Sequence, residues 1–142
     1  MKKHNFNQLT RIIARLRHPT HGCPWDLKQT HPSLKKYLRE ETKEVLEAID
    51  EYESNGEKDP EHLIEELGDL LLQIMLHSQL LSEKHRVDVS HVVDALSQKM
   101  VRRHPHVFGK TKVKNAQEVV SNWKKIKQQE KSDKKLKKKK IK

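Results

Sequence analysis

The sequence has few of the residues that build tight turns, stacked pockets or covalent cross-links. Its 142 residues include four Gly, five Pro and one Cys, and aromatic residues make up 4%. So few Gly and Pro argue against an all-β protein, which needs many tight turns. The lone cysteine, Cys23, excludes an internal disulfide and fits a reducing compartment. Because the first residues also show no apolar stretch typical of a secretory signal, we expect a cytoplasmic protein.

Long hydrophobic runs are also missing. Hydrophobic residues make up 33% of the chain and charged residues 35%, and no stretch approaches the ~20 apolar residues that a membrane-spanning helix requires. Strong helix formers such as Leu, Glu, Lys and Gln dominate the middle of the chain. The composition therefore predicts an all-α protein without a membrane partner, with one folded domain over residues 1–130.

Positive charge is abundant, but it is unevenly placed. The formal net charge is +10, and residues 131–142 hold eight Lys and one Asp, or +7, which leaves +3 for residues 1–130. We expect residues 131–142 to form a disordered, solvated tail because such a run repels itself. A nucleic-acid-binding arm is the alternative. It is not favoured, because the tail has no aromatic or Gly spacing to stack on bases or wrap around them.

Apolar residues at helical spacing predict five helices. Ser33 and Asp59 are expected to cap the second and third helices, and Asn115 with Glu118 forms a capping-box pattern at the last. Residues 18–32, which contain three prolines, and residues 104–109, which contain Pro105, are expected to be loops. The predicted helices cover residues 5–17, 33–52, 60–84, 88–103 and a segment that starts at 115 and fades into the tail.

The third predicted helix is apolar on nearly every side between Leu70 and Leu81. A helix of this kind needs burial on two faces, and a chain of this size has little core to offer. We therefore expect packed antiparallel helices, similar to a four-helix bundle, that are completed by a homodimer. A surface that binds and regulates another protein is the alternative.

Acidic residues interrupt the apolar faces of two predicted helices. Glu41 falls near the middle of an apolar stripe that runs from Leu34 to Tyr52, and Glu44 lies at its edge. On the next helix, Glu66 and Asp69 are one turn apart where apolar residues crowd. Surface acids paired with nearby Lys or Arg are the ordinary explanation of such residues. Ionised carboxylates on a core-facing stripe, however, are costly unless they are paired or bind a cation, and Mg²⁺ prefers oxygen ligands.

The two acidic segments also resemble a known signature. The strings Glu40-Glu41-Thr42-Lys43-Glu44 and Glu66-Leu67-Gly68-Asp69 are similar to the EExxE…ExxD pattern of the all-α nucleoside triphosphate pyrophosphohydrolases, and more narrowly of the MazG family. Further similar strings extend the resemblance from about residue 7 to residue 130. They are Gly22-Cys23-Pro24-Trp25-Asp26, Gln29-Thr30-His31, Glu65-Glu66-Leu67-Gly68-Asp69-Leu70-Leu71, Arg102-Arg103-His104-Pro105-His106-Val107-Phe108 and Trp123-Lys124-Lys125-Ile126-Lys127. Many members of the family carry two such domains in tandem, whereas one is expected here.

The resemblance implies an enzyme with an all-α fold, usually dimeric, that hydrolyses nucleoside triphosphates to the monophosphate and pyrophosphate. It implies Mg²⁺ as the cofactor, with Mn²⁺ as an alternative ion, and a role in keeping the nucleotide pool clean. Carried over position by position, the metal ligands are Glu41, Glu44, Glu66 and Asp69. Glu40 joins these four as a catalytic candidate, either as a base or as a partner of a ligand, and Glu47 is an equal alternative for that role.

The resemblance also implies four residues near the nucleotide: Lys99, Arg103, Trp123 and Lys127. Lys99 and Arg103 lie one turn apart and could bind the same phosphate tail, but a basic helix end is the plain alternative. Trp123 could contact a base or simply anchor a core. A non-enzymatic basic helical protein that binds nucleic acid through its Lys-rich tail remains the alternative function.

Overall fold

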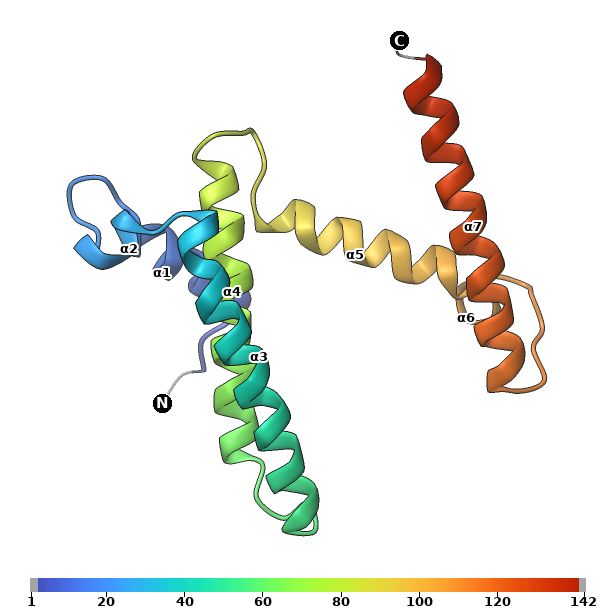
Figure 1. The fold of residues 1–142 in the computed structure, drawn as a ribbon, viewed down its shortest axis with the longest axis horizontal. Helices are drawn as coiled ribbons and strands as arrows, with labels where there is room; N and C mark the ends of the chain where they lie inside the picture. The colour runs from blue at the N-terminus through green and yellow to red at the C-terminus, as the bar shows by residue number, and fades with distance from the viewer. Residues whose placement is uncertain (1–2, 141–142) are drawn as a thin grey trace. The chain divides into compact units, whose positions relative to one another are not determined.

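The computed structural model describes residues 3–140, and it contains helices and no strand within that range. The predicted all-α class is confirmed. No helix of the described part is long and apolar enough to cross a membrane. The helices are labelled in Figure 1: α1 (Phe6–Leu16), α2 (Pro24–Lys28), α3 (His31–Ser54), α4 (Glu61–Ser82), α5 (Val89–Arg103), α6 (Pro105–Phe108) and α7 (Ala116–Lys140).

The chain divides into two compact units, one ending at His91 and the other starting at Val92. The boundary falls inside α5. The expected single domain over residues 1–130 therefore stays a prediction, and each unit is described by itself.

The first unit is built on an antiparallel pair of long helices, α3 and α4 (Figure 1), with α1 packed against α4. The turn between them includes Gly56, whose φ of +73° suits a glycine. The core lies where α1, α3 and α4 meet, and Leu34 at its centre is 0% exposed. The other buried members of this core are Ile13, Met75, Leu76, Leu80 and Val89.

A charged side chain ties the loop after α1 to the end of α4. Arg17 is buried and donates from Nε to Glu83 Oε1 at 2.6 Å and from Nη2 to Glu83 Oε2 at 2.8 Å. Its Nη1 donates to the backbone carbonyls of Asp26 and Gln29. In this loop Gly22 lies so close to the backbone that a Cβ would stand 2.5 Å from the carbonyl oxygen of Leu16. The loop is thus held by polar contacts rather than by a core of its own.

The second unit contains most of α5 together with α6 and α7. Two ion pairs join α5 to α7, from Arg102 Nε to Glu130 Oε1 and from Arg103 Nη2 to Glu130 Oε2, both at 2.7 Å. The His104 and Trp123 rings meet edge to face with their centroids 5.0 Å apart. No side chain described between residues 92 and 138 is buried.

Several helix boundaries differ from the predictions. α4 begins at Glu61 with Pro60 as its N-cap, so Asp59 is not the cap, although its Oδ1 accepts from the Glu61 N–H at 3.1 Å. Thr30, not Ser33, is the N-cap of α3; its hydroxyl accepts from the Ser33 N–H, and the Ser33 hydroxyl accepts from the Thr30 N–H. Two segments expected to be loops contain the short helices α2 and α6, which begin at Pro24 and Pro105. Proline breaks a helix interior but suits the first helical position, because its missing N–H has no partner there.

The tail also differs from expectation. Residues 131–140 continue α7 rather than forming the disordered segment that self-repulsion suggested, while residues 141 and 142 lie outside the described residues. Lys, Leu and Gln are strong helix formers, and solvent and salt screen the repulsion between exposed lysines. One half of the predicted capping box is confirmed at the start of this helix, where Asn115 Oδ1 accepts from the Glu118 N–H at 3.0 Å. The Glu118 carboxylate accepts from the Lys114 N–H rather than from the Asn115 N–H.

Candidate metal centre and substrate residues

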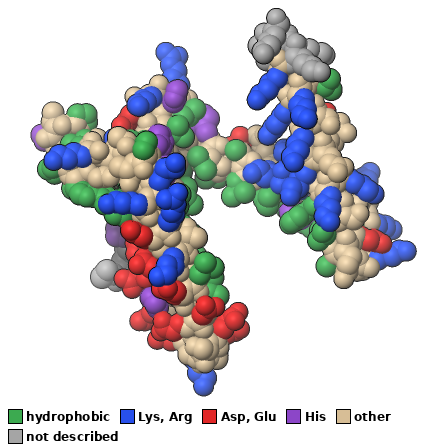
Figure 2. Space-filling view, viewed as in Figure 1, with side chains coloured by type: hydrophobic (Ala, Val, Ile, Leu, Met, Phe, Trp, Pro, Cys, Tyr) green, Lys and Arg blue, Asp and Glu red, His purple; other side chains and the backbone are tan. Residues whose placement is uncertain are grey.

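Three carboxylates come together between α3 and α4. Glu41 of α3 and Glu66 and Asp69 of α4 each offer one oxygen, and these oxygens all lie within 4.8 Å of one another. All three residues are half-buried. They meet because α3 and α4 are antiparallel and because each residue occupies a stripe that faces the other helix. Figure 2 shows acidic side chains gathered over the part of this helix pair that is nearer its connecting turn.

The surroundings of Glu41 disfavour its charge. Its pKa is raised, first by desolvation, then by the negative charges of Asp69 and Glu44 and a hydrogen bond with Glu44, and last by the charge of Glu66. Each cause penalises an ionised carboxylate, and none is a favourable contact between Glu41 and a cation. A cation that bound there would relieve this penalty.

A histidine that the sequence analysis did not single out contacts the cluster. His62 lies one turn before Glu66 on α4, with Nε2 3.2 Å from Glu66 Oε1 and Nδ1 2.7 Å from Glu51 Oε2. The hydrogen bond to Glu51, more than the weaker contribution of Glu66, raises the pKa of His62. The i, i+4 spacing of His62 and Glu66 is visible in the sequence, whereas the contact with Glu51 depends on how α3 and α4 pair.

The other two predicted carboxylates, Glu40 and Glu44, are outside the converging group. Glu44 is exposed and contacts Glu41, but it is not among the three residues whose oxygens converge. Glu40 is exposed. Their assigned roles remain predictions.

The donor set fits a hard divalent cation. It consists of oxygen atoms alone, which is typical of Mg²⁺, Mn²⁺ and Ca²⁺ sites rather than of zinc sites. The second oxygen of Glu66, Oε2, is buried and has no hydrogen-bond partner among the described residues. Buried carboxylate oxygens are rarely left unpaired, so this atom is a candidate ligand.

The predicted substrate residues all belong to the second unit. Lys99 and Arg103 lie on α5, and Trp123 and Lys127 lie on α7. Arg103 is engaged by Glu130, a partner that the sequence analysis did not identify. Trp123 is half-buried against His104, and Lys127 is exposed. Arg103 and Trp123 thus each contact a residue of the second unit, through an ion pair and a ring contact respectively, and the roles of all four residues at a nucleotide remain predictions.

Similar proteins identify the family. The model of the MazG nucleotide pyrophosphohydrolase domain matches residues 29–108, which include the three converging carboxylates. YabN of Bacillus subtilis, described as uncharacterized, is 50% identical over 91% of this chain and 25% of its own length. The nucleoside triphosphate pyrophosphohydrolase of Escherichia coli K12 is 41% identical over 91% of this chain and 47% of its own length.

A solved structure has the same fold. The crystal structure of a MazG-related protein from Thermotoga maritima superposes with a TM-score of 0.66 at 28% identity, and the match covers 86% of this chain and 98% of that one. This chain spans only a quarter to about half of the two curated relatives named above. The match of the domain model to more than half of the residues, together with this structural likeness, shows that the chain belongs to the MazG nucleotide pyrophosphohydrolase domain family.

Proposed function

We propose that this chain hydrolyses nucleoside triphosphates to nucleoside monophosphates and pyrophosphate, as part of nucleotide-pool maintenance. The observation that carries the proposal is the convergence of Glu41, Glu66 and Asp69 within 4.8 Å inside a MazG domain. These three residues and Glu44 would hold Mg²⁺, with Mn²⁺ as an alternative ion. When bound, such a cation polarises the phosphoryl oxygens and offsets the charge of the pyrophosphate.

The side chains around the cluster prepare it for a cation. His62 occupies one oxygen of Glu66 and leaves Oε2 without a partner, so the carboxylate has a free oxygen for binding. The raised pKa of Glu41 means that binding a cation must displace any proton that Glu41 holds, so affinity should fall as the pH falls. Glu40 and Glu47 are exposed and remain the two candidates for activating a water molecule.

Basic residues of the second unit would bind the phosphates. Lys99, Arg103 and Lys127 are assigned to the triphosphate and Trp123 to the base, as the family resemblance implies. Arg103 is already fixed by Glu130, which limits the entropy that the guanidinium would lose on binding a phosphate.

A second copy of the chain would cover one face of α4. Leu63, Leu67, Leu70, Ile74 and Leu81 lie at positions of the 4–3 spacing of a coiled-coil seam, and Leu67 and Ile74 are 49% and 43% exposed. His77, at the remaining position, packs against His31 of α3. A seam of this kind can pair with itself across a twofold axis, which supports a homodimer. Light scattering should show a dimer that Ile74→Glu dissociates and Leu136→Glu, at an exposed leucine of α7, does not. A monomeric wild-type chain would contradict the homodimer.

We also propose a cytoplasmic location. Its support is the single cysteine, Cys23, which is free and half-buried, as expected in a reducing compartment. Fractionation of cells that contain the protein should recover it in the cytoplasmic fraction, and recovery outside the cytoplasm would contradict this proposal.

The test of the activity is pyrophosphate release from a panel of ordinary and damaged nucleoside triphosphates, measured with Mg²⁺ and with EDTA. We expect release with Mg²⁺ only. Glu66→Gln should lower the rate by at least about a hundredfold, whereas Glu65→Gln, a change at the neighbouring exposed carboxylate, should leave it within about twofold. Equal rates in the two variants would overturn the assignment of Glu66, and the absence of release from every nucleotide would overturn the function.

A further inference from the structure

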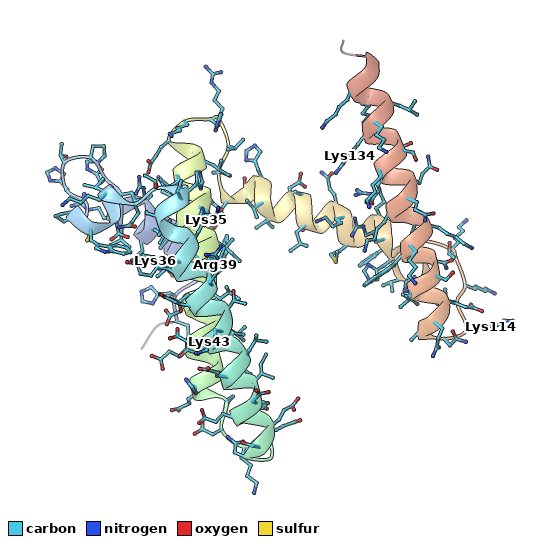
Figure 3. All side chains as sticks on the ribbon, viewed as in Figure 1. Lys35, Lys36, Arg39, Lys43, Lys114 and Lys134 are labelled. Carbon is cyan, nitrogen blue, oxygen red and sulfur yellow. The ribbon has the colours of Figure 1, made fainter. Side chains whose placement is uncertain are left out.

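Six lysines form one face of α7. Lys124, Lys127, Lys131, Lys134, Lys135 and Lys138 recur at intervals of three, four, three, one and three residues. At about 100° per residue they fall within an arc of about 100°, and they extend over about 21 Å of the helix axis. We call these six residues the lysine face. Figure 2 shows basic side chains, in blue, along this helix, and Figure 3 labels Lys134, which projects from its flank.

The lysine face is exposed and has no counter-charge. All six side chains are exposed, and the ion pairs of the described residues involve none of them. The three acidic residues of α7 lie outside the arc and have other partners. Glu118 accepts from the Lys114 N–H, Glu130 pairs with Arg102 and Arg103, and Asp133 accepts from Gln129.

We propose that the lysine face of α7 binds the phosphate backbone of a nucleic-acid duplex, independently of base sequence. A duplex carries about one negative charge per 1.7 Å of its axis, so about twelve phosphates lie along the length of this face. Six exposed cations with no ion-pair partner among the described residues therefore present a dense positive charge along one side of α7, which complements the dense negative charge of a duplex backbone. This binding would be a property additional to nucleotide hydrolysis, and it does not depend on the carboxylate cluster.

The same helix fits other polyanions less well. A helix that lies on a membrane needs a broad apolar face opposite its lysines. On α7, Val119, Trp123 and Ile126 are half-buried within the second unit, and Leu136 is the one apolar residue of the described range 131–140. Single strands are held largely by stacking on aromatic rings, and no aromatic residue lies on the lysine face. A duplex, recognised through its backbone alone, needs neither feature.

The experiment compares two full-length variants with the same change in net charge. The first replaces Lys131, Lys134, Lys135 and Lys138 by Gln; it leaves Lys124 and the proposed substrate residue Lys127 in place. The matched control replaces Lys112, Lys114, Lys125 and Lys137, four exposed lysines off the lysine face, by Gln. Gln has nearly the helix propensity of Lys, and circular dichroism of both variants checks that α7 remains helical.

Binding is measured by fluorescence anisotropy with DNA duplexes of two unrelated sequences, between about 50 and 200 mM salt. The wild-type chain should bind both duplexes alike, with affinity that falls steeply with salt. The lysine-face variant should bind at least about tenfold more weakly, and the slope of log affinity against log salt should shrink by about three. The control variant should keep most of the duplex affinity and most of the salt slope of the wild-type chain.

Three results would overturn the proposal. They are the absence of duplex binding by the wild-type chain, an equal loss of binding in the two variants, and tighter binding to vesicles rich in phosphatidylserine than to either duplex. None of these results bears on pyrophosphate release, because the four substituted residues of the lysine-face variant lie outside the proposed catalytic and substrate-binding residues. The two proposals can therefore fail separately.

Discussion

The two units of this chain hold their charges in different ways. In the first unit, Arg17 is buried and its side chain is 6% exposed, and three carboxylates crowd into a half-buried group. In the second unit, the lysines of α7 up to Lys138 are exposed, and Arg102 has a side chain that is 50% exposed. Every buried hydrophobic residue in the described part of the chain belongs to the first unit.

The difference follows from the core. A charged group that is desolvated by a packed core needs a specific partner of opposite charge. Carboxylates that cluster beside such a core therefore favour the binding of a small cation. Without such a core, like charges stay hydrated and spread along a helix face, where they suit an extended partner. This difference is consistent with the proposals that the first unit binds a small cation and that the second binds an extended polyanion.

The largest effect that would test this contrast is the loss of a core side chain. Leu34→Ala in the first unit should lower the free energy of unfolding by about 2–5 kcal/mol, because it leaves a cavity at a position that is 0% exposed. Leu136→Ala in the second unit, at a leucine that is 58% exposed, should change it by less than about 0.5 kcal/mol. Urea denaturation of both variants measures the difference, and similar losses would show that α7 is more deeply packed than the contrast allows.

Arginine substitutions should give the next largest effect. Arg17→Met removes a buried partner of Glu83 and of two backbone carbonyls, and it should cost about 3 kcal/mol of stability. Arg102→Met removes an exposed ion pair while Arg103 still holds Glu130, and it should cost less than about 1 kcal/mol. Thermal unfolding at two salt concentrations checks both values. If the loss of stability caused by Arg17→Met became much smaller at high salt, the Arg17–Glu83 pair would be solvent-exposed rather than buried.

Neutralising Glu41 should sharpen the contrast further. With EDTA, Glu41→Gln should raise the free energy of unfolding by up to about 1 kcal/mol, because it removes a carboxylate whose pKa is raised by desolvation and by Asp69, Glu44 and Glu66. Addition of Mg²⁺ should stabilise the wild-type chain and have less effect on the variant. Differential scanning fluorimetry gives both readouts, and destabilisation of the metal-free variant would show that Glu41 is paired rather than repelled.

The smallest effect concerns His77, which packs against His31 with Nδ1 atoms 2.7 Å apart. Desolvation and then the His31 charge lower the pKa of His77, so the folded chain binds this proton more weakly than the unfolded chain does. The contribution of His77 to the free energy of unfolding is therefore complete above the unfolded pKa of about 6.5, and it is lost as the pH falls below that value. The melting temperature should drop between about pH 7.5 and 5.5, and His77→Gln should flatten that drop.

The pKa of His62 is shifted in the opposite direction to that of His77, so His62 serves as an internal check. Its pKa is raised by Glu51, so its contribution is present below pH 6.5 and is lost as the pH rises. His62→Gln should therefore steepen the acid loss of stability rather than flatten it. Identical pH profiles for the two histidine variants would contradict both assignments.

Periodicity and capping predicted most of the fold. Asn115 caps α7, as its spacing to Glu118 predicted. At α3, Thr30 and Ser33 both have a hydroxyl that could cap a helix, and the earlier residue, Thr30, is the N-cap. The helices at Pro24 and Pro105 are too short for an apolar repeat to reveal them. The extent of α7 depends on a balance between helix propensity and screened repulsion that the sequence alone does not settle.

The candidate site could be predicted where an acidic residue interrupts the apolar face of a predicted helix. Glu41 and Asp69 stand among apolar neighbours, and this conflict identified them from the sequence. His62 and Glu130 create no such conflict, because a polar residue on a polar face gives no signal. Their contacts with Glu51 and Arg103 arise from the pairing of distant segments.

The buried guanidinium of Arg17 also determines how the first unit opens. It joins two carbonyls of the loop between α1 and α3 to Glu83, just after α4. The loop cannot swing away without leaving a charge in the interior, so its fluctuations are coupled to fraying of α4. In hydrogen exchange, the amides of residues 22–29 and those of the last turn of α4 should therefore exchange as one cooperative unit, although they are more than fifty positions apart in the chain.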